Sequence, residues 1–239
     1  MLSSNLNHKL SNENFLSNYS LLLPYIGPYF AYVLIASIFS GLSPTINYTL
    51  RIIVVILLML YFWRWYIPFR GPKSILKSVL YGIIFGLVGT ILWILALKPF
   101  VDVGVKNWNI SDFLVRLIAS SLLVPVFEEL LMRGYIFRVA FQWSIERKKN
   151  KKSFEKALHD KSINNFEPGA WNVTAILVST LAFTFGHRVY EFPAAILYGF
   201  LMILLWIRRK DLISCMVAHG TTNLTLGLYV GLTKHWELW

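Results

Sequence analysis

Seven apolar segments follow one another along this chain of 239 residues, and several approach or exceed the length of a membrane span. A helix needs about 18 to 20 apolar residues to cross the hydrocarbon core of a bilayer. One signal anchor does not explain so many segments. We therefore predict an all-α fold, a polytopic bundle of about seven to eight transmembrane helices that forms a single membrane domain over residues 1–239. The expected spans are 21–42, 50–68, 78–98, 113–140, 170–188, 193–207 and 212–231.

The composition agrees with this class of protein. Hydrophobic residues make up 56% of the chain, above the roughly 45 to 50% of an average soluble domain. The net charge of +11 resembles that of a nucleic-acid-binding protein, but the charges lie in the connections between spans and form no basic face with interleaved aromatic residues. We therefore expect membrane lipids as partners and no nucleic acid. The single cysteine, Cys215, excludes an intrachain disulfide framework and a Cys-rich zinc cluster.

The distribution of cations predicts the orientation. If the connections alternate between two sides, one side receives sixteen lysines and arginines and the other receives five. Cytoplasmic loops carry the excess of such residues, so we expect an integral protein of a bacterial inner (cytoplasmic) membrane with a cytoplasmic N-terminus. Residues 1–20 form a polar N-terminal tail, and 146–169 a basic cytoplasmic loop that is mobile or lies on anionic lipid.

The fourth segment contains ionisable residues, which are costly inside a membrane and therefore mark functional or paired sites. Glu129 and Arg133 are four residues apart, so they share a helix face and can form a buried ion pair. Glu128 points about 100° away around the helix and has no such partner. Pro125 removes a backbone donor nearby and is expected to bend the helix, so that Glu128 faces a water-filled cavity.

The fifth and seventh segments add further polar side chains. Phe183 and His187 share one helix face, and His219 and Asn223 share another. A carboxylate can take a proton from water, an imidazole can hold that water, and a second imidazole with an amide can donate hydrogen bonds to an oxyanion. Hydrolysis of an amide bond requires this set of groups.

These motifs resemble a known family. Glu128-Glu129-x3-Arg133, Phe183-x3-His187 and His219-x3-Asn223 occur in order in apolar segments, as in the CPBP family of type II CAAX prenyl proteases and bacteriocin-processing membrane proteases. The stretches Val124 to Glu129 and Gly227 to Trp239 further resemble its subgroup associated with exosortase and PEP-CTERM systems.

The resemblance implies an intramembrane glutamic endopeptidase of about eight helices with a catalytic core over residues 110–231. Glu128 would activate water, His187 would assist it, and His219 with Asn223 would stabilise the oxyanion. Glu129, Arg133 and Phe183 would be supporting residues. The expected substrate is a peptide or a lipidated protein, processed as a CAAX-type or leader-peptide substrate, with no cofactor and a site that opens toward the cytoplasm or laterally to lipid.

Straight helices place the two histidines at different depths. At 1.5 Å per residue, His219 lies roughly 10 to 12 Å from the cytoplasmic end of its helix and His187 roughly 25 Å from the same side. The two side chains meet only if the helices tilt or if the fifth helix begins after residue 170. We favour the later start, with Trp171 and Asn172 outside the bilayer.

Three alternatives remain open. Cys215, His219 and Asn223 have the residue types of a thiol protease, although a lone cysteine in an apolar helix is usually inert. Glu128, His187 and His219 have the residue types of a catalytic zinc site, which would make the protein a zinc-dependent membrane endopeptidase. A non-enzymatic scaffold or a proton-coupled carrier would instead use buried glutamate and histidine as a relay.

Overall fold

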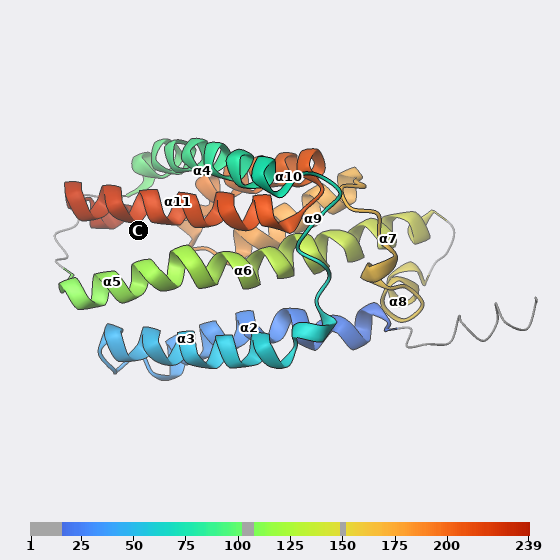
Figure 1. Ribbon diagram of the computed structural model, residues 1–239, viewed down its shortest axis with the longest axis horizontal. Coiled ribbons are helices and arrows are strands. Elements are labelled where there is room, and N and C mark those ends of the chain that lie inside the picture. The colour runs from blue at the N-terminus through green and yellow to red at the C-terminus, as the bar shows by residue number, and fades with distance from the viewer. Residues whose placement is uncertain (1–15, 102–107, 149–151) are drawn as a thin grey trace, which may run out of the picture.

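The computed structural model describes residues 16–101, 108–148 and 152–239 (Figure 1). The regular elements in these ranges are all helical, as predicted. The helices are α2 Asn18–Ile38, α3 Pro44–Tyr61, α4 Ile75–Leu97, α5 Ile110–Ile118, α6 Val124–Glu129, α7 Phe137–Arg147, α8 Ser153–His159, α9 Val173–Phe185, α10 Phe192–Arg209 and α11 Leu212–Thr233.

Five of the described helices are long and apolar enough to span a membrane: Asn18–Ile38, Pro44–Tyr61, Ile75–Phe100, Ile110–Arg147 and Val189–Arg209. Helix α9 is apolar but shorter, and α11 has 22 residues. Each of the seven predicted segments corresponds to one of these helical passes. The second begins earlier than residue 50 because the Ser43 side chain accepts a hydrogen bond from the Ile46 amide and Pro44 occupies the first turn.

The passes run antiparallel between two ends of the bundle (Figure 1). The end that we call the basic end contains the starts of α2, α4, α9 and α11, together with α8. The opposite end, called the C-terminal end, contains the starts of α3, α5 and α10 and residues 234–239. The first described helix therefore starts at the basic end, and α11 finishes at the C-terminal end.

The fourth pass, Ile110–Arg147, is one long helix with two irregular parts. Ala119–Leu123 and Leu130–Ile136 form π-helical turns on either side of α6. Such wide turns inside α-helices are rare and frequently occur at functional sites. They change the angular positions of the side chains of α6 relative to those of α5 and α7. Pro125, where a bend was expected, therefore lies between two irregular turns of the same long helix.

Helices α4 and α11 pack closely along a row of glycines. A Cβ atom at Gly82 would lie 2.7 Å from Val217, and one at Gly86 would lie 2.6 Å from the Ala218 carbonyl oxygen. Small residues allow helix backbones in membranes to approach one another. This close approach fixes the position of α11, the helix that carries His219.

The segment expected to be a loop at 146–169 is partly helical where it is described. Helix α8 packs against α7 and α2 at the basic end. The side-chain amide of Asn18 donates to the Ala157 carbonyl, and its backbone N–H donates to the Lys161 carbonyl. Ile163 is fully buried. This segment therefore packs against the bundle rather than lying only on lipid. Residues 149–151 of the loop, and residues 1–15 of the expected N-terminal tail, lie outside the described residues.

Candidate active site

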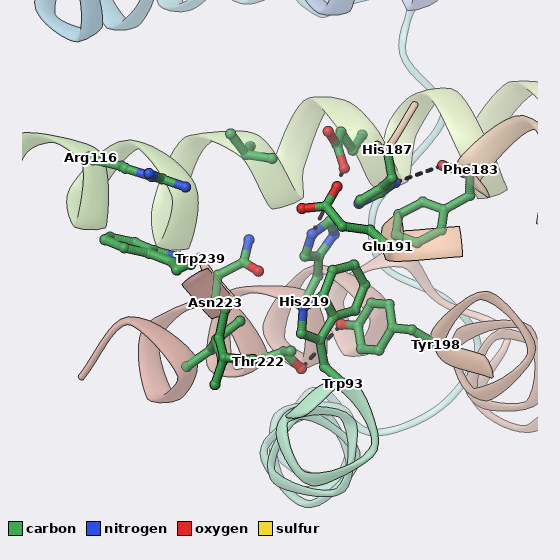
Figure 2. A pocket seen from close by; sticks show the side chains of 14 residues that line it. Trp93, Arg116, Phe183, His187, Glu191, Tyr198, His219, Thr222, Asn223 and Trp239 are labelled. Carbon is green, nitrogen blue, oxygen red and sulfur yellow. Dashed lines mark hydrogen bonds and ion pairs between the residues drawn. The ribbon is translucent and has the colours of Figure 1, made fainter. Parts of the chain in front are cut away.

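A cavity of about 150 Å³ lies among α4, α6, α9, α10 and α11 and extends toward the C-terminal end. It brings together the four side chains for which the sequence suggested a catalytic role. Figure 2 shows His187, His219 and Asn223 around this space, with aromatic rings beside them. The residues expected at the site and found in its wall are Glu128, His187, His219, Asn223 and Phe183.

Glu129 has two partners within the bundle and is fully buried. Its Oε1 atom lies 3.2 Å from Nη1 of Arg133, so the ion pair expected from the four-residue spacing is present. The same oxygen lies 3.0 Å from Nδ1 of His219. Glu129 therefore connects the helix that carries the glutamates to α11 and fixes the orientation of the His219 ring, a contact that the sequence did not reveal.

Glu128 faces the cavity instead of Arg133, as the helix geometry indicated. Its side chain is 17% exposed, whereas that of Glu129 is 0% exposed. The Glu128 Oε2 atom lies 3.8 Å from Nε2 of His219, beyond hydrogen-bonding distance. A water molecule in the cavity can therefore contact the carboxylate without displacing an existing hydrogen bond between these two side chains.

His187 reaches the same cavity although its helix enters from the basic end. Helix α9 begins at Val173, later than residue 170 as favoured above, and Gly169 packs against Lys210 at the end of α10. The imidazole folds back over its own helix, with its Nδ1 atom 2.8 Å from the Phe183 carbonyl oxygen. Because a carbonyl accepts only, Nδ1 carries the proton, and Nε2 is the nitrogen available to a ligand.

Asn223 is positioned by the irregular part of the fourth pass. Its Nδ2 atom donates to the Ser120 carbonyl, 2.7 Å away. One Asn223 amide proton is therefore used structurally, and the second is available to the cavity.

Helix α11 also approaches the fourth pass closely beside this hydrogen bond. The Ser121 carbonyl would normally accept from residue 125, but Pro125 has no amide proton. Gly220 of α11 packs against that carbonyl, where a Cβ atom would lie only 2.6 Å from the oxygen.

Aromatic residues that were not expected at the site form much of its wall. The Trp93 ring lies 5.4 Å from that of His187, and the Tyr198 ring lies 5.9 Å from that of His219. The Tyr198 hydroxyl donates to Thr222 at 3.2 Å. Trp93 follows Gly86 and Gly89 at helical spacing, so the row of small residues could have predicted that this side of α4 faces the interior.

The wall nearest the C-terminal end includes Arg116, Glu191 and Trp239. The Arg116 guanidinium lies over the Trp239 ring at 4.3 Å and over the Trp108 ring at 4.8 Å. Figure 2 shows Arg116 and Trp239 on the side of the cavity away from Phe183 and Tyr198. Arg116 is therefore part of this wall.

Two of the alternative sites have little geometric support. Cys215 is fully buried and does not line the cavity. Within residues 16–101, 108–148 and 152–239, no three His, Cys, Asp or Glu side chains are grouped closely enough to hold one metal ion. The arrangement of Glu128, His187 and His219 therefore does not fit the zinc site that their residue types suggested.

Comparison with known proteins identifies the segment that carries this geometry. Residues 110–225 match the family model described as "Type II CAAX prenyl endopeptidase Rce1-like". No curated protein and no solved structure matches the chain. The matched segment includes the glutamates, both histidines of the cavity and Asn223. Residues 110–225, just under half of the chain, thus form an Rce1-like domain similar to the type II CAAX prenyl endopeptidase (CPBP) family of peptidases.

Proposed function

We propose that this protein is an intramembrane endopeptidase in which Glu128 activates the water that hydrolyses a peptide bond. The main observation is the position of Glu128, which faces a cavity shared with His187, His219 and Asn223 while its neighbour Glu129 is occupied by Arg133 and His219. The similarity of residues 110–225 to a family of endopeptidases supports the reaction class. The two adjacent glutamates thus have different environments, as a catalytic and a supporting residue require.

In the proposed reaction, the Glu128 carboxylate accepts a proton from water as the oxygen attacks the scissile carbonyl carbon. His187, with Nε2 facing the cavity, holds the same water. The C–O bond forms and the carbonyl oxygen becomes an oxyanion. The free amide proton of Asn223 stabilises this charge. His219 contributes when both of its ring nitrogens carry protons, because Nδ1 donates to Glu129 and only a protonated Nε2 can donate to the oxyanion. Protonated Glu128 then gives its proton to the leaving amine, and the C–N bond breaks.

The proposed substrate is a peptide segment of a membrane or exported protein, with or without an attached lipid. The finer assignment to the subgroup associated with exosortase and PEP-CTERM systems has its support in the residues around Glu128 and in the stretch from Gly227 to Trp239. We propose a bacterial inner membrane as its location, with the basic end of the bundle in the cytoplasm.

The test is a comparison of the membrane proteomes of cells that express the wild-type protein or the Glu128→Gln variant. The substitution keeps the size of the side chain but removes the base, so precursors accumulate and turnover falls by about 10²- to 10⁴-fold or more. Glu155→Gln, an exposed glutamate of α8, is the matched control. Full processing in a Glu128→Gln strain with normal levels of the protein would refute the mechanism.

A further inference from the structure

The site cavity extends toward the C-terminal end of the bundle and away from the basic end, and this direction bears on how a substrate reaches it. The cavity extends from His219 in the interior to Glu191, Leu238 and Trp239 at the C-terminal end. A second cavity of about 200 Å³ lies at that same end and shares Arg116 and Trp239 with the first. The two cavities follow one another in the direction away from the basic end, with Arg116 and Trp239 in the wall that they share.

The cations of the described residues are unevenly divided between the two ends (Figure 1). Twelve lysines and arginines lie in the helix ends and connections at the basic end, compared with five at the C-terminal end. The basic end has Arg64, Arg70, Lys73, Lys77, Arg147, Lys148, Lys152, Lys156, Lys161, Arg208, Arg209 and Lys210. The C-terminal end has Arg51, Lys98, Arg116, Arg188 and Lys234. All connections are short enough for the positive-inside rule to apply.

From these two observations we infer that the site is reached from the non-cytoplasmic side of the membrane, through the outer cavity beside Arg116 and Trp239. The inference extends the proposed function, because it specifies the substrate as a peptide segment exposed on that side. It differs from the expectation of a site that opens toward the cytoplasm or laterally to lipid. A cytoplasmic substrate would meet the basic end, where the structure packs α8 and the α10–α11 turn instead of the cavity.

The outer cavity has the character of a membrane–water interface. Its wall contains Tyr190, Trp236 and Trp239 together with Arg188 and Glu237. Tryptophan and tyrosine concentrate where the hydrocarbon core meets the headgroups, and charged side chains remain hydrated there. A peptide strand can pass through such a layer with its polar backbone in contact with water or polar side chains. The inner cavity lies beyond Arg116 and Trp239, which form the wall shared by both.

Two matched cysteine variants test this inference. Val189→Cys places a thiol at the C-terminal end, and Phe154→Cys places one on α8 at the basic end; the wild-type side chains are 78% and 53% exposed. The other thiol, Cys215, is buried in the wild-type structure and is expected not to react. A membrane-impermeant, polymer-linked maleimide is added to intact cells. We expect a gel shift for Val189→Cys at once and for Phe154→Cys only after the membrane is permeabilised.

The same reagent also tests access to the site. Complete labelling of Val189→Cys in intact cells should stop processing of the precursors that accumulate with Glu128→Gln, whereas labelling of Phe154→Cys in permeabilised cells should leave processing intact. The opposite labelling pattern, or full processing after complete labelling of Val189→Cys, overturns the inference. If Glu128→Gln changes no precursor, the proposed function fails, but the labelling pattern still decides the orientation.

Discussion

The Nδ1 atom of His219 lies 3.0 Å from Oε1 of Glu129, and the same oxygen lies 3.2 Å from Nη1 of Arg133. One buried carboxylate thus holds both a cation on its own helix and an imidazole on α11. The second ring nitrogen of His219 is directed toward Glu128. Glu129 is therefore a positioning residue for the proposed site as well as a structural one.

Glu129→Gln should lower both the stability of the protein and its turnover. The change leaves the Arg133 guanidinium buried without a counter-charge, and breaking a buried pair in this way costs about 3 to 5 kcal/mol. It also removes the charged acceptor that orients His219. Thermal unfolding in detergent and precursor processing measure the two effects. Glu146→Gln, which disrupts the partly exposed pair with Lys161, should cost at most about 1 kcal/mol. Normal stability with lost turnover would reverse the roles of Glu128 and Glu129.

Cys215→Ser should retain turnover. The thiol is fully buried and does not line the cavity, so it has no access to a substrate in this structure. A small loss of stability is expected because the hydroxyl is more polar than the thiol it replaces. Cys215→Ala avoids that polarity and serves as the second variant. If both variants fold normally but no longer process the precursor, the thiol mechanism is favoured instead.

Gly86→Ala should destabilise the bundle and impair the site from a distance. The added Cβ atom would lie 2.5 Å from Cβ of Thr221 and 2.6 Å from the Ala218 carbonyl oxygen, so α11 must move away from α4. Overpacking of this kind costs about 1 to 3 kcal/mol, and the displacement includes His219. Gly41→Ala is the matched control, because a Cβ atom there meets nothing within 4 Å. Equal melting temperatures of the two variants would argue against close packing of the helices.

Local sequence rules predicted part of this structure well. Helical spacing was enough to pair Glu129 with Arg133 and to direct Glu128 away from that arginine, because both statements concern a single helix. The order of the apolar segments gave the sequence of passes, and the start of α9 after residue 170 was also expected.

The features that were missed depend on contacts between distant segments. The Glu129–His219 contact joins residues 90 positions apart, and nothing in either motif indicates it. The π-helical turns beside α6 have no simple sequence signal, although they set the direction of Glu128. Trp239 reaches the cavity wall only because the residues after α11 fold back toward Phe113 and Gly227. Such placements follow from packing of the whole bundle.

His187→Gln should reduce turnover while the protein keeps its fold. The imidazole is held by the Phe183 carbonyl through Nδ1, so Nε2 is available to the water that Glu128 activates. Glutamine is of similar length but cannot present a ring nitrogen at this position, and loss of such a group costs about 10²-fold or more in rate.

The matched control for this prediction is His159→Gln at the end of α8, where the ring lies 4.8 Å from that of Tyr19 and does not line the cavity. It should leave processing unchanged. The measurement is the rate at which the precursor disappears in membranes that contain equal amounts of each variant. If His187→Gln processes at the wild-type rate, His187 serves only to pack against Phe183 and Trp93, and Glu128 with His219 must then activate the water without it.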